Sequence, residues 1–462
     1  KVIAAGLFLR TGLADDRLLK PGFVHAAEEG LIAADGHDGA ILRMANEEPL
    51  PPARTGARWG VPDERLVGLD PRAGQTTQRA SRITAAYEQG GARNSDEYLS
   101  AGRAYVLLGV GNAQAVRSAL AAFDRATAAD SGNFDAQLRA GELFLEKYNA
   151  PDARLSFEGI LRRSPTDAKA LLAMARVEEF EGKGNPMATA RLSIASDPRY
   201  AEALAFVATM HRDAEAYDSA RVYAQRAIDA DSTSSAGWSV LGSMAFLNGD
   251  SATFRKSLAA VTALQPAPAP FYTELAEASV RQRRYTEAVA LAKRATGYDS
   301  LYVPAYGVLG TNQLRIGQMD AGRAALERAF ALDPFNLWHK NTLDLLDKMK
   351  SFRTIDRGRF RVVAPADEAE LLALYIVPLL EQAYDSLAVR YGYKPPTPIR
   401  LEFYRYHADF SVRTVGLAGL GALGVSFGMG VGVGGDGKSQ RHQNAEIAEV
   451  LLIYCTAPPT RW

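Results

Sequence analysis

The chain has 462 residues, room for roughly two to four domains of ordinary size, so one short motif cannot account for all of it. Its 53 Lys and Arg residues balance 53 Asp and Glu residues, which argues against a broad basic surface, and nucleic acid is not expected as a partner. A hydrophobic fraction of 47% with 23% charged residues excludes disorder throughout, and the single cysteine, Cys455, excludes an internal disulfide.

Residues 1–94 lack a helical hydrophobic period and are predicted to form an irregular extension. The stretch "NEEPLPPARTGARWG" is rich in Pro, Gly and Arg, whereas "QRASRITAAYEQGG" (78–91) is predicted to form a helix that caps the segment after it. The opening "KVIAAGLFLRTG" is too short an apolar stretch for a signal peptide, and we expect the chain to be a fragment. His25 and His37 have no ligand-type neighbours at helical spacing and are not expected to bind metal.

A set of four residues recurs in the middle of the chain. The first set is Trp238, Leu241, Gly242 and Pro266, and its equivalents 68 residues later are Tyr306, Leu309, Gly310 and Pro334. This distance is twice a period of about 34 residues. Small residues at the glycine position let two helices approach each other, and Pro or Asp ends the second helix of each unit. The spacing therefore predicts stacked helix pairs, seven of them over residues 95–336.

This pattern resembles that of tetratricopeptide repeat proteins, and the resemblance covers about half of the chain. It implies a mainly α fold, a right-handed superhelical solenoid of helix pairs whose concave groove holds a protein or peptide partner. The competing interpretation is that the solenoid serves as a spacer or as a brace for another domain. Arg281, Arg283, Arg284 and Asn312 are candidate groove residues, but we expect them to be solvated surface groups.

The pattern changes after Pro334. "NLWHKNTLDLLDKMKSF" is amphipathic and predicts a capping and linker segment over 337–356. "GRFRVVAP" then alternates as a strand, "DEAELLALYIVPLLEQAYDSLAVRYGY" has the apolar stripe of a long helix, and "IRLEFY" is a second strand. Residues 357–428 are therefore predicted to form part of an α/β domain.

Residues 359–428 resemble the opening of the zinc metallopeptidase domain of the peptidase MA, or gluzincin, type. The stretch "HADFSVRTVGLAGLGALGVSFG" carries the most specific part of this resemblance. In that family a later helix carries H-E-x-x-H, whose histidines bind zinc and whose glutamate acts as general base. The chain contains no H-E-x-x-H, so no catalytic residue or metal ligand is carried over, and zinc is expected only for a full-length parent. The resemblance also implies an exported bacterial protein.

The last segment, 429–462, departs from the family pattern and is predicted to be an aberrant, glycine-rich and truncated tail. His407 is expected to be a helix-entry residue, and His442 and Cys455, thirteen residues apart, make a poor zinc site. The uncharged stretch 414–435 is long enough to cross a bilayer, but its glycines argue against a membrane span.

"GVGGDGKS" (432–439) matches the phosphate-loop pattern through Gly432, Gly437, Lys438 and Ser439. Only 23 residues follow Ser439, too few for the rest of a nucleotide-binding domain, so the match is predicted to be accidental.

The sequence thus predicts a protein-interaction scaffold that carries an incomplete, catalytically inactive metallopeptidase-like domain, with no activity and no cofactor in this chain. The alternatives are a fragment of a zinc peptidase whose H-E-x-x-H helix lies beyond the chain and, as a minor one, nucleotide binding at 432–439.

Overall fold

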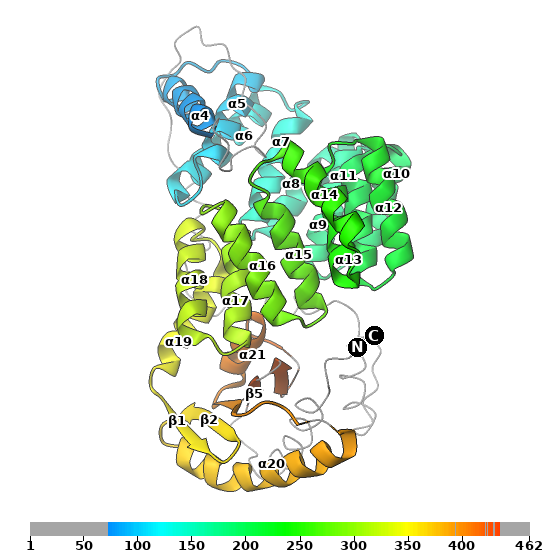
Figure 1. The fold of residues 1–462 in the computed structure, drawn as a ribbon. Coiled ribbons are helices and arrows are strands. Elements are labelled where there is room, and N and C mark those ends of the chain that lie inside the picture. Colours follow the sequence, from blue (N-terminus) through cyan, green and yellow to red (C-terminus); the bar gives the residue numbers. More distant parts are fainter. Residues whose placement is uncertain (1–72, 393, 421, 423, 428–429, 435–462) are drawn as a thin grey trace. The chain divides into compact units, whose positions relative to one another are not determined.

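The computed structural model describes residues 73–392, 394–420, 422, 424–427 and 430–434. These residues divide into two units: one holds 73–309 and 328–336, and the other holds 310–327 and the described residues from 337 onward. Helices in repeated pairs make up most of the described chain, and a small sheet follows them (Figure 1). The predicted fold class, a mainly α solenoid followed by a partial α/β domain, is confirmed.

The paired helices alternate between a first and a second helix of each repeat, after the single helix α4 (Ala73–Glu88). The first helices are α5 (Ser95–Leu107), α7 (Phe134–Glu146), α9 (Ala168–Glu181), α11 (Ala201–Asp213), α13 (Ser235–Asn248), α15 (Ala269–Arg281) and α17 (Val303–Arg315). The second helices are α6 (Ala113–Ala129), α8 (Ala150–Arg163), α10 (Pro186–Ser196), α12 (Tyr217–Ala230), α14 (Ser251–Leu264), α16 (Tyr285–Tyr298) and α18 (Met319–Leu332).

Short polar side chains fix where many of these helices begin. At each such start a side-chain oxygen accepts a hydrogen bond from a backbone N–H of the first helical turn, a group that the helix itself leaves without a partner. The capping residues are Asn94, Asn112, Asn133, Asn149, Asp167, Asn185, Ser234 and Asp250. Both helices of the first, second, third and fifth pairs start at such a cap, whereas α11, α12, α15 and α16 start without one.

Glycines at the predicted contact position bring neighbouring helices close together. A Cβ atom on Gly141 of α7 would overlap the ring of Phe157 in α8. A Cβ atom on Gly242 of α13 would lie 2.6 Å from Cε2 of Phe271 in α15. Both phenylalanine rings are fully buried. The absent side chains therefore leave the space that these rings fill.

The turn between the two helices of a repeat needs one residue in the left-handed region. Six successive repeats place a residue with φ between 60° and 81° at this turn: Tyr148, Gly182, Glu215, Gly249, Arg283 and Gly317. Glycine adopts this conformation without steric cost, whereas a residue with a Cβ atom does so at a cost of roughly 1–2 kcal/mol. Three of the six turns are therefore strained.

Replacing Arg283 by glycine is expected to stabilise the solenoid. Its φ of 61° stays favourable for glycine, so Arg283→Gly should raise the free energy of unfolding by about 1 kcal/mol. Arg283→Ala is the matched control, because it removes the same exposed side chain and keeps the strained Cβ atom. Urea unfolding followed by far-UV circular dichroism measures both; equal stability of the two variants would contradict the strain.

The turn after the last helix pair contacts the first two repeats. Nζ of Lys147 lies 3.5 Å from Oδ1 of Asp333, and Asn336 donates a hydrogen bond to the hydroxyl of Tyr148. The backbone N–H of Gly111 donates to the carbonyl oxygen of Leu332 at 2.7 Å. All of these residues belong to the solenoid unit, so its last turn is fastened to its first repeats.

The second unit contains a five-stranded mixed sheet of order β1-β2-β3-β5-β4. β2 and β3 are parallel, as are β3 and β5, whereas β1/β2 and β4/β5 are antiparallel. Its elements are α19 (Leu337–Met349), β1 (Phe352–Arg357), β2 (Phe360–Pro365), α20 (Ala369–Tyr391), β3 (Ile399–Tyr404), α21 (His407–Val415), β4 (Gly424–Phe427) and β5 (Gly430–Gly434).

Helices cover both faces of this sheet. On one face, alternate residues of β2 and β3 pack against the buried side of α20, with Val362, Leu401 and Leu380 near the centre. On the other face, Tyr404 packs with Phe410 of α21 and with α19. The alternation of side chains along β3 thus gives each face its own core.

Two strands lie where the sequence predicts other structure. All but the last residue of β1 fall within the capping and linker segment 337–356, and β5 falls within the segment 429–462 that is predicted to be an aberrant tail. β5 nevertheless pairs with a strand on each side, because ladder hydrogen bonds override the low strand propensity of glycine. Its glycines 430, 432 and 434 lie opposite Arg400, Glu402 and Tyr404, respectively. Glycine at these places leaves room for large polar side chains on that face of the sheet.

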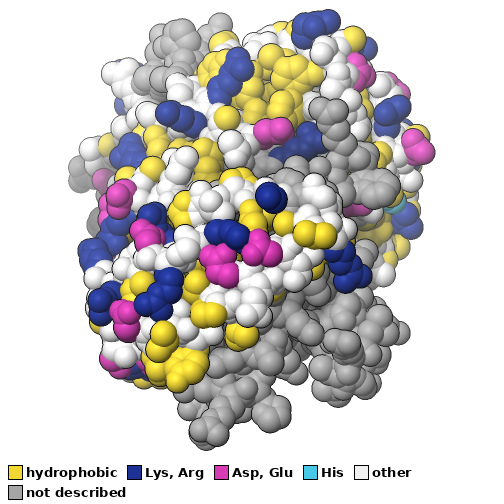
Figure 2. All heavy atoms as spheres, turned by 60° about the horizontal axis from the view of Figure 1, so that its bottom comes forward, with side chains coloured by type: hydrophobic (Ala, Val, Ile, Leu, Met, Phe, Trp, Pro, Cys, Tyr) yellow, Lys and Arg dark blue, Asp and Glu magenta, His cyan; other side chains and the backbone are white. Residues whose placement is uncertain are grey.

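Within the described residues, one helix, α20, is long and apolar enough to cross a membrane, judged by length and composition alone. Residues 414–435, the stretch considered from the sequence, instead contain the end of α21 and two strands. The side of α20 away from the sheet exposes Leu371, Leu374, Tyr375 and Leu379. Figure 2, turned so that this helix comes forward, shows apolar side chains interspersed with acidic and basic ones.

Candidate functional site

The phosphate-loop match is divided between a strand and residues outside the described chain. Gly432 is paired with Glu402 in the β3/β5 ladder, and Gly437, Lys438 and Ser439 lie outside the described residues. Nucleotide binding there stays a minor alternative.

Of the potential metal ligands weighed from the sequence, one, His407, lies in the part of the chain that the structure describes. His25, His37, His442 and Cys455 lie outside it. His407 is the first residue of α21, and its Nε2 lies 2.8 Å from the carbonyl oxygen of Ala422. Across residues 73–434, gaps aside, no group of three or more His, Cys, Asp and Glu residues could hold a metal ion.

The four candidate groove residues occupy different environments. Arg281 is exposed and lies 3.4 Å from a carboxylate oxygen of Asp213. Arg283 is in the strained turn, and Arg284 donates to the carbonyl oxygen of Leu247 at 3.2 Å. Asn312 differs from the expectation of a solvated group: it is 2% exposed and accepts a hydrogen bond from Arg315. Asn312 belongs to residues 310–327, which are part of the sheet-containing unit.

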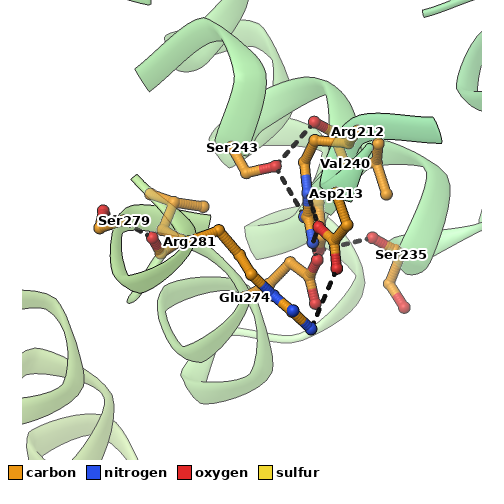
Figure 3. Close-up of polar contacts among 10 residues, drawn as sticks. Arg212, Asp213, Ser235, Val240, Ser243, Glu274, Ser279 and Arg281 are labelled. Atoms are coloured by element: carbon orange, nitrogen blue, oxygen red, sulfur yellow. Dashed lines mark hydrogen bonds and ion pairs between the residues drawn. The ribbon is translucent and has the colours of Figure 1, made fainter. Parts of the chain in front are cut away.

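A charged cluster that the sequence analysis missed lies on the first helices α11, α13 and α15 (Figure 3). Arg212 is its centre and is 5% exposed. Its guanidinium donates to Asp213 at 2.7 Å, to the hydroxyl of Ser243 at 3.1 Å, and to Glu274. Arg281 approaches Asp213 from α15, so that residues far apart in the sequence share one network. This arrangement satisfies a buried cation with two carboxylates and a hydroxyl.

Electrostatics couple this cluster to a fourth helix, α9. Desolvation by the surrounding protein raises the pKa of Glu277 to about 7, and the neighbouring carboxylate of Glu274 adds to the shift. Desolvation also raises the pKa of Glu179 on α9. The charge of Asp213 raises this pKa further, and that of Arg281 lowers it. Both glutamates are nevertheless exposed to solvent.

The cluster occupies one face of the first helices. Glu277 and Arg281 are four residues apart on α15, and Arg176 and Glu179 are three apart on α9, the spacings that place side chains on the same side of a helix. In this cluster, no ion pair joins Glu277 or Glu179 to a described basic residue at hydrogen-bond distance, whereas Asp213 and Glu274 both pair with Arg212. Two exposed carboxylates and the exposed guanidinium of Arg281 thus remain available on this face.

The sequence does contain a signal for the buried arginine. Arg212 comes four residues after Ala208 and eight after Leu204, and these spacings place it on the same apolar stripe of the helix. A charge at this spacing points toward the core and requires partners. The identity of those partners, one of them 62 residues away, could not be read from the sequence.

Comparisons with known proteins concern the helical part of the chain. A tetratricopeptide repeat model matches residues 111–168. A tetratricopeptide repeat protein from Parabacteroides merdae is 13% identical over 54% of this chain and 97% of its own, with a TM-score of 0.36. Pseudomonas aeruginosa pilF is 19% identical over 45% and 95%, with a TM-score of 0.29, and yeast Tom70 is 12% identical over 56% and 58%, with a TM-score of 0.39. A search of curated proteins found no match.

The matched segment contains the second helix of the first pair, the whole second pair and the turn into α9. The same pairing continues through α18, with a left-handed turn residue at equivalent places. The helical part of this chain is a solenoid of paired helices, and its residues 111–168 match the tetratricopeptide repeat family.

Proposed function

We propose that the solenoid is a protein-interaction scaffold and that it binds a peptide segment of its partner along the charged face of the first helices. The observation that carries the proposal is the convergence of Glu179, Arg212, Asp213, Glu277 and Arg281 on that face. Arg212, Asp213 and Arg281 are held in one network, whereas Glu179 and Glu277 lie exposed beside it, and an ordered charged face with accessible groups suits recognition.

The coupling between distant repeats supports a concave binding surface. Glu179 of α9 belongs to the third helix pair and Arg281 of α15 to the sixth, yet Arg281 lowers and Glu274 raises the pKa of Glu179. Gln282, just after α15, also donates to the hydroxyl of Tyr217, at the start of α12, at 2.9 Å. Repeats that are not neighbours in the stack approach each other on this side. A curved stack of helix pairs presents an extended concave face of this kind.

The proposal predicts that charge reversal on this face weakens partner binding. Peptides selected from a random dodecapeptide library on the wild-type protein should bind the double variant Glu277→Arg/Arg281→Glu at least about tenfold more weakly, because two charges act with the wrong sign. Fluorescence anisotropy with the labelled peptides measures the affinities.

Lys293→Glu on the second helix α16 is the matched control, since it reverses an exposed charge outside the face. It should leave the affinity unchanged. An equal loss in the control, or a selection that yields no binding peptide, would count against the proposal.

A further inference from the structure

A hollow of about 300 Å³ lies between the starts of the first helices α7, α9 and α11, apart from the charged cluster. Its lining residues are Phe134, Asp135, Leu138, Ile160, Asp167, Ala168, Lys169, Asp197 and Tyr200. This volume is at the lower limit of small-molecule sites, so it suits one long side chain better than a whole cofactor.

The base of the hollow is apolar. Leu138 of α7 and Ile160 of α8 are buried, and Phe134 and Tyr200 contribute aromatic rings beside them. The guanidinium of Arg163 already lies over the ring of Phe134, 5.3 Å from the ring centroid. An aliphatic stem can therefore pack on the base, and the aromatic rings tolerate a cation near them.

The rim of the hollow carries three carboxylates and one ammonium group. Oδ1 of Asp167 caps α9 by accepting from the N–H of Ala170 at 2.8 Å, and Oδ1 of Asp197 accepts from the N–H of Arg199 at 3.0 Å. Asp135 is 4.0 Å from Arg139, the outer limit of an ion pair. Against these, Lys169 is the single basic residue of the lining.

Helix ends modify this balance. Asp135 and Asp167 lie at helix starts, where they offset the positive ends of α7 and α9. Asp197 follows the carboxyl end of α10, where the helix itself contributes negative charge. The surplus of negative charge is therefore greatest around Asp197 and extends toward Asp135.

We infer that this hollow takes one basic side chain, arginine or lysine, of the partner segment, with the stem on Leu138 and Ile160 and the cationic head between Asp135 and Asp197. Lys169 of the hollow and Arg176, which lies on the side of α9 that carries Glu179, are seven residues apart, so the hollow and the charged cluster share one face of α9. The inference thus rests on the proposed function and adds the chemistry of one partner residue.

The test uses the buried Ile160 as a reporter. In protein labelled with ¹³C at the isoleucine δ1 methyl groups, and assigned with Ile160→Val, N-acetylarginine N-methylamide should shift the Ile160 signal in a saturable way. The corresponding citrulline compound, which has the same shape and no charge, should bind several-fold more weakly, and the glutamate compound should give no saturable shift.

Variants locate the charge that is responsible. Asp135→Asn/Asp197→Asn should weaken the arginine compound about tenfold, because two carboxylates at roughly 0.5–1 kcal/mol each are lost. Lys169→Glu should tighten it several-fold, and Asp229→Asn, which removes an exposed carboxylate on α12, should change nothing. Asp167 is left intact because it caps α9. An unchanged affinity in the double variant, or a response to glutamate as strong as that to arginine, overturns the inference.

The two proposals fail separately. If the selected dodecapeptides depend on Glu277 and Arg281 but the Ile160 methyl group responds to none of the three compounds, the hollow is not a binding site and the scaffold function stands. If no dodecapeptide is selected, the scaffold proposal falls, while the arginine titration still decides whether the hollow binds a cation.

Discussion

Replacing Glu402 by glutamine is expected to destabilise the sheet-containing unit by about 3–5 kcal/mol, the usual cost of removing one partner from a buried ion pair. The Glu402 carboxylate is 5% exposed and accepts from Arg400 and Arg413 at 2.7 Å each and from the hydroxyl of Tyr404 at 2.7 Å. Arg413 also donates to the carbonyl oxygen of Leu314 at 3.1 Å. Glutamine would leave the buried guanidinium of Arg413 and the partly buried guanidinium of Arg400 without a negative charge.

Hydrogen exchange of the β3 amides, followed by mass spectrometry, measures this loss locally without assuming that the whole chain unfolds in one step. The matched control is Asp356→Asn, because Asp356 pairs with Arg361 at 2.7 Å but both side chains are exposed. Its effect should stay below about 1 kcal/mol. Comparable protection of β3 in wild type and Glu402→Gln would refute a stabilising role for the buried pair.

Acid should reproduce the effect of this substitution. Burial opposes ionisation of Glu402, but Arg413 and Arg400 outweigh it and lower its pKa from 4.5 to about 2. A carboxyl group with a lowered pKa in the folded state stabilises the fold fully above pH 4.5 and loses that contribution as the pH falls toward 2. Over that range the wild-type unit should lose protection more steeply than Glu402→Gln does.

The second large effect is expected from Arg212→Met, at about 3 kcal/mol of solenoid stability. Burial lowers the pKa of Arg212, but the carboxylates of Glu274 and Asp213 outweigh it, and the pKa lies above its usual value. Methionine fills much of the same space while leaving both carboxylates and the Ser243 hydroxyl without the cation. The cost is at the lower end of the range because Asp213 and Glu274 are 20% and 24% exposed and can gain water.

Urea unfolding of the helical signal checks this prediction. Arg281→Met serves as control, since its side chain is 67% exposed and its loss should cost less than about 1 kcal/mol. Arg212→Lys retains the charge without the planar fork and should fall between wild type and methionine. If the Arg212 and Arg281 variants unfold at the same urea concentration, the network contributes nothing measurable to stability.

The repeats could be predicted because their signal is periodic. The recurrence of Trp238 and Gly242 as Tyr306 and Gly310 shows the pairing of helices in a sequence with no other guide, since each contact position recurs every repeat. β3 could also be predicted, from the alternation of its residues, and α20 could be predicted from its apolar stripe. The metallopeptidase resemblance of 359–428 is carried by the sequence alone and stays a prediction.

What the sequence did not reveal depends on contacts between distant segments. β1 reads "FRTIDR", where charges interrupt the alternation, and it becomes a strand because β2 pairs with it along its whole length. β5 reads as a glycine-rich loop until β3 and β4 are placed on either side of it. In the same way, Arg212 on an apolar stripe signals a buried charge, but only the fold brings Glu274 to it.

The contacts between the last turn and the first repeats bear on how the solenoid folds. A linear array of repeats can nucleate anywhere and grow by adding neighbours, and its ends open first. Here Asn336 bonds to Tyr148 across 188 residues, so completion of the native state includes the closure of a very long loop. That step slows the final stage of folding and ties both ends of the array into the same cooperative transition as its middle.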